Sequence, residues 1–512
     1  MPLTKDIVTI PPMDKHNQTL VSNVHPSNWE NPTPTEVYNL VVIGGGTAGL
    51  VTAIGAAGLG AKVALIEKHL MGGDCLNVGC VPSKAIIRSS RVVAEIREAS
   101  SYGVRVPDGT EANFAAVMER VRKLRAGISH HDSAERYKNL GIDVFLGEAQ
   151  FKTSYSVEVN GKILKFKKAV IATGARAAHP PIPGLPEAGF LTNETVFNLT
   201  SLPKRFLIVG AGPIGCELAQ AFSRLGSEVH LFEAMHGFLP REDQDAAGIL
   251  KNGFDKEKIH SLCCCNILKV EKRGMEKIVH FTAKHEGEKP QEIAVDEILI
   301  GVGRIPNVTG LNLETVGVKY DSKSGVQTND YLQTTNPNIY AAGDICLKYK
   351  FTHTADATAR IVIQNALFFN SKKVSSLIVP WCTYTDPEIA HVGLYEQEAK
   401  EKGIEVETFT REFKEVDRAI LDGETEGFVK VHVKKGTDTI LGSTIVSRHA
   451  GDMISEITLA MTAKVGLGTI ANAIHPYPTQ AEAIKQVADA YNRTRLTPTI
   501  KKIISNWLVW RR

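Results

Sequence analysis

The sequence predicts an α/β protein in which two Rossmann-like domains precede a smaller C-terminal α/β domain. Three observations lead to this fold class. The chain has 512 residues, more than one hydrophobic core ordinarily accommodates. A strand, a glycine turn, a helix and a second strand follow one another twice, from about residue 38 and again from about residue 205. From about Val379 the pattern changes to alternating strands, such as 427–433, and to a helix near 456–462.

Each repeated unit contains every element of a dinucleotide-binding motif, including an acidic residue at the end of its second strand. The first unit consists of the strand 38–43, Gly44, Gly46, Gly49, a small-residue helix over 50–58, the strand 62–66 and Glu67. The second consists of the strand 205–209, Gly210, Gly212, Gly215, a helix over 216–225, the strand 228–232 and Glu233. The spacing from first glycine to acid is the same in both units. Two full motifs with one spacing outweigh the interpretation of both as ordinary glycine turns.

The glycine turns predict pyrophosphate sites, because a helix N-terminus offers free N–H groups and a positive dipole end to an anion. The acid at the end of the second strand is placed to accept hydrogen bonds from ribose hydroxyls. Two bound dinucleotides imply a hydride relay, and FAD with a nicotinamide nucleotide is the natural pair. A 2′-phosphate would be repelled by Glu233, and the next arginine is Arg241, so the sequence favours NADH over NADPH.

Two cysteines just after the first unit, Cys75 and Cys80, predict a redox-active pair. Glycines flank both, and a helical pattern over 85–98 follows. A thiol near a helix N-terminus has a lowered pKa and is reactive. The alternatives are a structural disulfide or half of a zinc site, but no Cys or His of suitable spacing lies nearby to complete a zinc site. We therefore predict no metal site in the chain.

Composition argues against several other classes of protein. The net charge of +3 indicates neither nucleic acid nor an acidic partner. No run of eighteen apolar residues predicts a membrane span, and the polar, proline-rich N-terminus lacks the features of a signal peptide. Eight cysteines are few for this length, which favours a reducing cytoplasm. Residues 1–36 are expected to form an extension in which prolines oppose regular structure.

Near the C-terminus, His475 and Glu482 predict an acid–base pair. Thiol–disulfide exchange requires a group that takes and returns protons, and a histidine oriented by a carboxylate does this near neutral pH. His475 is one of sixteen histidines, so its assignment as an acid–base residue depends on the presence of the cysteine motif in the same chain.

Together these motifs resemble the pyridine nucleotide–disulfide oxidoreductase family (class I) over roughly residues 38–490. The resemblance implies a homodimer with an FAD domain, an NAD domain, a return to the FAD domain and a dimerisation (interface) domain. The implied division is an extension over 1–36, a first segment of the FAD-binding domain over 37–180, the NAD-binding domain over 181–303, a second, central segment of the FAD-binding domain over 304–378, the dimerisation domain over 379–490 and a C-terminal tail over 491–512.

The resemblance also implies roles for individual residues. Cys75 corresponds to the thiol that exchanges with substrate, and Cys80 to the thiol that contacts the flavin. Lys84 corresponds to the lysine beside the flavin and Glu217 to its ion-pair partner. His475 and Glu482 correspond to the pair that the neighbouring subunit supplies. Further implied contacts are Thr173, Gly174 and Asp344 to FAD, and Gly303, in the segment that closes the NAD domain, to NAD.

Within the family, the run 80–88 and the segment 417–419 are most similar to mercuric reductases. Two departures separate the chain from mercuric reductases. Mercuric reductases carry a C-terminal cysteine pair, whereas the last cysteine here is Cys382. They also have a tyrosine near the position of the histidine, whereas this chain keeps His475 and Glu482, as dihydrolipoamide dehydrogenases do. The predicted enzyme therefore passes electrons from NAD(P)H through FAD and the Cys75–Cys80 disulfide to a disulfide or a soft metal ion. Dihydrolipoamide dehydrogenase is the alternative.

Two features stand outside this account. The run 263–265 consists of three cysteines, and adjacent side chains on a strand cannot all point one way, which disfavours a metal site. The basic, apolar tail 500–512 is compatible with a membrane surface, but docking on its own dimer or simple fraying is favoured. An alternative of another class is a non-catalytic flavoprotein subunit docked through this tail. The intact set of predicted catalytic residues argues against it.

Overall fold

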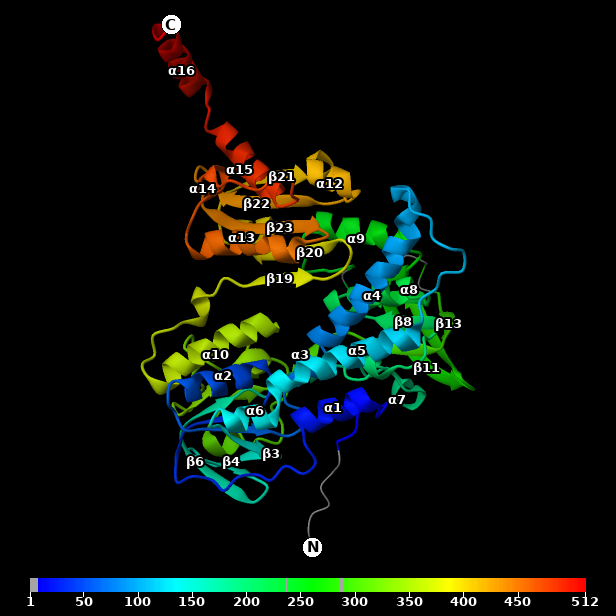
Figure 1. Ribbon diagram of the computed structural model, residues 1–512, viewed down its shortest axis with the longest axis vertical. Coiled ribbons are helices and arrows are strands. Elements are labelled where there is room, and N and C mark those ends of the chain that lie inside the picture. Colours follow the sequence, from blue (N-terminus) through cyan, green and yellow to red (C-terminus); the bar gives the residue numbers. More distant parts are fainter. Residues whose placement is uncertain (1–7, 236, 285–286, 288) are drawn as a thin grey trace. The chain divides into compact units, whose positions relative to one another are not determined.

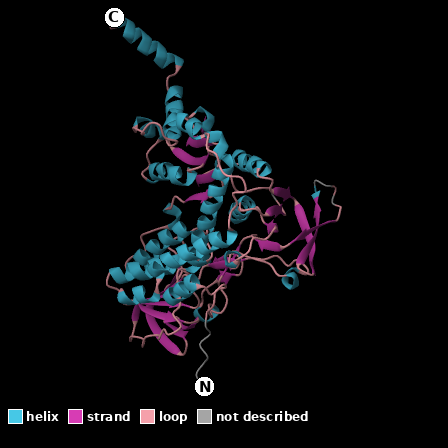
Figure 2. Ribbon diagram, turned by 45° about the vertical axis from the view of Figure 1, so that its right-hand side comes forward, coloured by secondary structure: helices cyan, strands magenta, loops and turns pink. Residues whose placement is uncertain are grey.

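The computed structural model describes residues 8–235, 237–284, 287 and 289–512. The chain divides into two compact units. The first unit comprises the residues up to Gly237 together with Lys258–Leu377, and the second comprises Phe238–Glu257 together with Ile378–Arg512. Figure 1 traces both along the chain, and Figure 2 shows that helices and strands are mixed throughout. The α/β class that the sequence predicts is confirmed.

The largest sheet of the first unit has a parallel core with antiparallel strands at one side. Its order is β3-β2-β1-β6-β5-β4, with β18 pairing β6. The pairs among β1, β2, β3, β6 and β18 are parallel, and β4, β5 and β6 pair antiparallel. The bounds are β1 Tyr38–Ile43, β2 Val63–Glu67, β3 Asp143–Leu146, β4 Ala149–Thr153, β5 Ser156–Val159, β6 Lys162–Ile171 and β18 Ile339–Ala341.

The helix of the first glycine motif, α2 (Thr47–Gly58), packs closely against α10 (Thr352–Leu367). A Cβ at Gly55 would lie 2.5 Å from Cδ1 of Ile363, so a larger residue there would require the Ile363 side chain to shift. Small residues along α2 thus let a helix far away in sequence lie beside it.

The second glycine motif lies in a parallel sheet of order β10-β9-β8-β14, also in the first unit. A three-stranded antiparallel sheet, β11-β12-β13, follows β10 in sequence. The elements are β8 Arg205–Val209, α8 Pro213–Arg224, β9 Glu228–Glu233, β10 His260–Cys263, β11 Cys265–Arg273, β12 Glu276–Ala283, β13 Gln291–Val295 and β14 Glu297–Ile300. The three adjacent cysteines mark the change of sheet, because β10 ends at Cys263, Cys264 has φ +56° and β11 begins at Cys265.

The second unit contains a five-stranded antiparallel sheet of order β19-β20-β23-β22-β21. The strands are β19 Pro380–Thr383, β20 Glu388–Gly393, β21 Val406–Glu412, β22 Phe428–Lys434 and β23 Ile440–Ser447. The helices are α9 Gln244–Lys256, α11 Glu396–Glu401, α12 Asp417–Asp422, α13 Ala450–Thr462, α14 Leu467–Asn472, α15 Glu482–Thr494 and α16 Pro498–Trp510.

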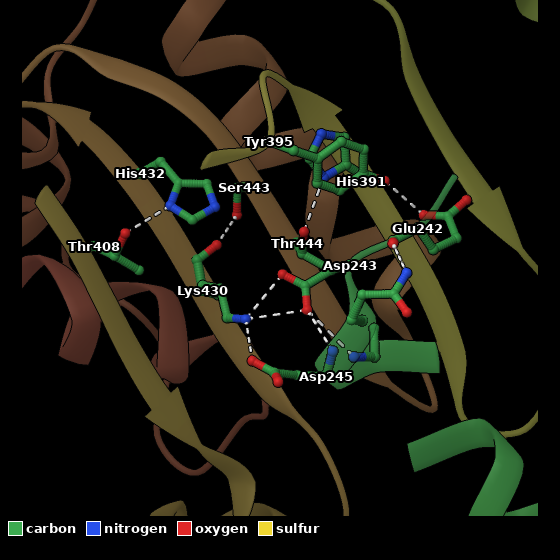
Figure 3. Close-up of polar contacts among 12 residues, drawn as sticks. Glu242, Asp243, Asp245, His391, Tyr395, Thr408, Lys430, His432, Ser443 and Thr444 are labelled. Carbon is green, nitrogen blue, oxygen red and sulfur yellow. Dashed lines mark hydrogen bonds and ion pairs between the residues drawn. The ribbon is translucent and has the colours of Figure 1, made fainter. Parts of the chain in front are cut away.

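Helix α9 is joined to this sheet by buried polar contacts (Figure 3). Lys430 of β22 contacts the carboxylates of Asp243 at 2.8 Å and Asp245 at 2.6 Å. Glu242 accepts hydrogen bonds from Tyr395 and from the indole of Trp381, both at 2.8 Å. A segment distant in sequence is thereby fixed on the sheet through charge-assisted bonds.

The structure corrects two expectations about the N-terminal half. The extension is not without regular structure: α1 spans Lys15–Val24, and Leu20 and Val24 are fully buried. Its prolines flank the helix rather than interrupt it, and Asp14 caps its N-terminus by accepting from two backbone N–H groups. The helix expected over 85–98 begins earlier, since α4 spans Cys80–Glu98. Pro82 is tolerated there because N–H groups in a first turn have no intrahelical partner.

The remaining helices of the first unit are α3 Gly73–Asn77, α5 Phe114–Ile128, α6 Ala134–Asn139 and α7 Leu185–Ala188. A buried polar contact links α1 to α3 through α5. Arg125, 1% exposed, donates to Oδ1 of Asn17 and to the carbonyl oxygen of Asn77, both at 2.7 Å. Burial lowers the pKa of Arg125 to about 10. The extension therefore supports the segment that carries the two predicted redox cysteines.

Replacing Asn17 with alanine should destabilise the protein, because the buried guanidinium of Arg125 then loses one of its two acceptors. We expect a loss of about 1–3 kcal/mol in the free energy of unfolding, measured by urea denaturation. Gln18→Ala is the matched control, since its side-chain hydrogen bond is exposed and its loss should cost under about 0.5 kcal/mol. Equal effects of the two substitutions would show that the contact is not a support.

Candidate functional site

The first glycine turn leaves open space at the N-terminus of α2. Gly44 has φ +109°, and a Cβ at Gly49 would lie 1.8 Å from the carbonyl oxygen of Gly44, so neither position accepts a side chain. Gly46 precedes α2 and caps it without a side-chain bond. A Cβ at Gly46 would meet only the Cα of Gly73, at 3.6 Å. Such a turn fits a pyrophosphate, because the helix N–H groups stay available to an anion.

Glu67, at the end of β2, holds the turn in place. Its carboxylate accepts from the backbone N–H of Gly45 at 2.6 Å and of His69 at 2.7 Å. These bonds fix the acid beside the turn, which is the position required for contact with a ribose.

The second turn repeats this geometry. Gly210 has φ +106°, and a Cβ at Gly215 would lie 1.9 Å from the Gly210 carbonyl oxygen, whereas a Cβ at Gly212 would meet nothing within 4 Å. Glu233 accepts from the N–H of Ala211 at 2.9 Å and of Met235 at 3.0 Å. The residues present therefore fit two dinucleotides, one at each turn.

The redox segment touches the first turn through backbone alone. The N–H of Gly72 donates to the carbonyl oxygen of Gly45 at 2.8 Å. Gly73 has φ +55°, and a Cβ there would lie 2.6 Å from the Cα of Gly46. A side chain at Gly73 would separate the two segments, so the contact fixes the thiols relative to the turn.

Cys75 lies in α3, and Cys80 is the first residue of α4. No disulfide joins them. The pKa of Cys80 is lowered, chiefly because the Cys75 thiol donates a hydrogen bond to it and further because Thr352 and the Lys84 charge stabilise the thiolate. The same hydrogen bond and burial raise the pKa of Cys75. Oγ1 of Thr352 lies 3.4 Å from Sγ of Cys80. The pair is thus asymmetric, with the thiolate on Cys80.

Lys84 lies one helical turn after Cys80 and contacts the buried carboxylate of Glu217 at 2.8 Å. The ion pair that the sequence suggested is present in the structure. It brings α8, the helix of the second glycine motif, to the helix of the redox pair.

Arg304 is a site residue that the sequence interpretation missed, although it directly follows Gly303, in the segment expected to close the NAD domain. Its guanidinium contacts Asp74, the neighbour of Cys75, and lies 3.5 Å from the carboxylate of Asp344. Burial raises the pKa of both carboxyl groups. Only the folded chain brings Arg304, Asp74 and Asp344 together, so no local pattern could reveal the group. The hydroxyl of Thr173 donates a hydrogen bond to the carbonyl oxygen of Asn307, three residues after Arg304, at 2.9 Å.

The predicted acid–base segment lies in the second unit, where His475 has a different carboxylate partner from the one expected. Nε2 of His475 lies 2.9 Å from Oε1 of Glu456, on α13, and the histidine side chain is 8% exposed. Glu482 is the first residue of α15, and among the described residues no hydrogen bond or ion pair joins it to His475. The adjacent Tyr477 is 69% exposed. Its hydroxyl donates to Asp417 at 3.0 Å, which raises its pKa.

Comparison with known proteins agrees with this site. The family model "Pyridine nucleotide-disulphide oxidoreductase" matches residues 38–359, and its dimerisation-domain model matches 379–488. The chain belongs to this family. It is an FAD-dependent oxidoreductase that uses a pyridine nucleotide.

Relatives within the family carry different names. The chain is 35% identical to a mercuric reductase of Staphylococcus aureus over 89% of this chain and 83% of that protein. It is 34% identical to a dihydrolipoyl dehydrogenase of Thermus scotoductus over 90% of this chain and 98% of that protein. Among solved structures, the HOCl-induced flavoprotein disulfide reductase RclA from Escherichia coli is similar, with a TM-score of 0.77 and 26% sequence identity. The match covers 88% of this chain and 99% of the RclA chain. A Cu(II) complex of RclA is also similar, with TM-score 0.78. This oxidoreductase is thus of the mercuric reductase, lipoamide dehydrogenase and RclA kind.

The asymmetry of the thiol pair predicts a pH dependence. In the FAD-loaded protein reduced by two electrons, long-wavelength absorption from the Cys80 thiolate should be present above its lowered pKa. The absorption should disappear as the pH falls through that pKa, because the thiolate is then protonated. Thr352→Val removes one stabilising hydrogen bond, so the loss should occur at a higher pH, by up to about one unit.

Thr354→Val is the matched control for this titration. Thr354 lies on the same helix, and its hydroxyl has no hydrogen-bond partner among the described residues. The titration should not move in this variant. A shift to lower pH in Thr352→Val, or equal shifts in both variants, would contradict the assignment of the thiolate.

Proposed function

We propose that this oxidoreductase reduces a thiophilic metal ion, with Hg(II) as the reference substrate, at the Cys75–Cys80 pair. The overall reaction balances as NAD(P)H with Hg(II) giving NAD(P)⁺, a proton and Hg(0). Thiolates are soft ligands that favour such ions over magnesium or calcium. Both mercuric reductases and a Cu(II)-complexed disulfide reductase are among the similar proteins.

Each group in the site has a role in this proposal. The first glycine turn would hold FAD, which when bound would supply the transfer of an electron pair from the nicotinamide nucleotide to the Cys75–Cys80 disulfide. Cys80, whose thiolate is the stabilised one, is the thiol on the flavin side, and Cys75 is the thiol that meets substrate. Lys84 and Glu217 supply a fixed charge pair beside Cys80. Asp344, held by Arg304, and Thr173 with Gly174 are proposed to contact FAD.

One observation favours a metal ion over a disulfide. A disulfide substrate needs a base that moves a proton at every step, and the predicted base, His475, is turned toward Glu456 and nearly covered. Tyr477, two residues after His475, is 69% exposed and is the residue type expected near this position in mercuric reductases. Its hydroxyl contacts Asp417, in the segment 417–419 that the sequence already related to mercuric reductases.

Dihydrolipoyl dehydrogenase is retained as the second candidate, because a relative of that name covers 90% of this chain at 34% identity. In that case His475 would be the base, with Glu456 in contact with it and Glu482 as the predicted orienting acid. We propose a homodimer in either case, on the strength of the dimerisation-domain match over 379–488.

Paired substitutions distinguish the two candidates. If the acceptor is a metal ion, Tyr477→Phe should lower Hg(II)-dependent NADH oxidation about tenfold, and His475→Gln should leave it within about threefold. Activity with lipoamide should be low in the wild type. High lipoamide activity that falls on the order of a hundredfold in His475→Gln would reject the metal proposal and support the second candidate.

Nucleotide choice supplies a further test at the second glycine turn. Glu233 carries a carboxylate where the 2′-phosphate of NADPH would lie, so we propose NADH as the preferred donor. We expect kcat/KM for NADH to exceed that for NADPH about tenfold or more, equivalent to about 1.4 kcal/mol per decade. Glu233→Gln removes the negative charge but keeps a side-chain oxygen that accepts hydrogen bonds from the turn. It should therefore lower the ratio of kcat/KM for NADH to kcat/KM for NADPH. A preference for NADPH in the wild type would reverse the assignment.

A further inference from the structure

Helix α16 at the C-terminus is a regular helix with none of its residues buried. It spans the thirteen residues Pro498–Trp510. Thr497 caps it by accepting from the N–H of Ile500 at 3.3 Å, and Pro498 occupies its first turn. A helix of this length without packing is marginal in water, so it calls for a surface that covers it. Figure 2 shows it as the last element of the chain.

Six of the seven large apolar side chains exposed on α16 gather on one side, and Val509, which is 62% exposed, lies on the other. They recur at helical spacing, and the charged and amide side chains fall on the other side. The apolar set is Ile500, Ile503, Ile504, Trp507, Leu508 and Trp510. Trp510 is 80% exposed and Ile503 is 62% exposed. Two of the four tryptophans of the chain stand on this face.

The charge of this segment has a single sign. No acidic residue follows Asp489, and six basic residues do: Arg493, Arg495, Lys501, Lys502, Arg511 and Arg512. Lys501 borders the apolar face near its start, Lys502 lies on the polar side of the helix, and the guanidinium of Arg511 lies over the ring of Trp507 at 5.0 Å. An apolar face with tryptophans and with only cationic charges around it matches the interface of an anionic lipid bilayer.

A bilayer satisfies both features of α16 at once. Its acyl region covers the apolar face, and its anionic headgroups neutralise the lysines and arginines. The helix is about 20 Å long, shorter than the hydrocarbon core of a bilayer, which is about 30 Å thick. We therefore expect it to lie in the plane of the membrane surface.

We propose that α16 binds the oxidoreductase peripherally to membranes that contain anionic lipids. This departs from the docking on its own dimer that the sequence favoured, and it does not depend on the identity of the electron acceptor. A lipid surface is chosen over a second copy of the chain because the segment after Asp489 carries six cationic side chains and no acid.

The experiment uses the full-length FAD-loaded protein and sedimentation with vesicles. We expect binding to phosphatidylcholine vesicles that contain phosphatidylglycerol, at least about tenfold stronger than to phosphatidylcholine alone, and weakened by high salt. Trp507→Ser with Trp510→Ser should abolish binding, and Lys501→Gln with Lys502→Gln should weaken it on the order of tenfold or more. Lys372→Gln with Lys373→Gln, an exposed lysine pair in the first unit, is the matched control and should bind as the wild type does.

Other outcomes would overturn the proposal. They are absence of vesicle binding by the wild type, equal binding to both lipid mixtures, or loss of binding in the Lys372 and Lys373 control. Light scattering of the Trp507 and Trp510 variant guards against misfolding and tests the alternative occupant. If that variant changes its oligomeric state while the wild type ignores vesicles, α16 docks on a second copy of the chain.

Discussion

The contact between the first glycine turn and the redox segment is the constraint on which the remainder of the site depends. It consists of one hydrogen bond, from Gly72 to Gly45, and of the close approach of Gly73 to Gly46. Because both sides are backbone, no rotamer change can alter the distance from the nucleotide turn to the backbone of the segment that carries the thiols. Gly79 extends the constraint to Cys80, since a Cβ there would lie 2.8 Å from the carbonyl oxygen of Asp74. The thiol pair is therefore positioned by the same backbone that forms the nucleotide site.

Charge distribution around the pair follows from this placement. Cys80 starts α4, so the helix dipole and the hydrogen bonds from Cys75 and Thr352 all favour its thiolate. The charge of Lys84 also favours the Cys80 thiolate and lowers its pKa, and the carboxylate of Glu217, the ion-pair partner of Lys84, opposes this effect. The two cysteines therefore differ in protonation: Cys80 is stabilised as the thiolate, and Cys75 is held as the thiol that donates a hydrogen bond to it.

The sequence predicted those features of the site whose signals are local. The two glycine turns, Glu67, Glu233 and the cysteine pair each lie within a short segment, and the strand–turn–helix rules apply to such segments directly. The Lys84–Glu217 ion pair was expected only through the family resemblance, and other contacts that depend on tertiary structure were missed. Arg304 meets Asp74 across 230 residues, and Asn17 reaches Arg125 across 108 residues. The carboxylate partner of His475 could not be predicted from the sequence either, because Glu456 lies on α13 and comes close to His475 only when the chain folds.

The central claim is that Cys80, and not Cys75, is the thiol beside the flavin. Absorption spectra of two single variants, purified with FAD and without reductant, test it most directly, because neither variant can form the disulfide. Cys75→Ser leaves the Cys80 thiolate in place and should show long-wavelength absorption that is lost on acidification, and Cys80→Ser should bind FAD and show none. Long-wavelength absorption in Cys80→Ser and its absence in Cys75→Ser would contradict the account.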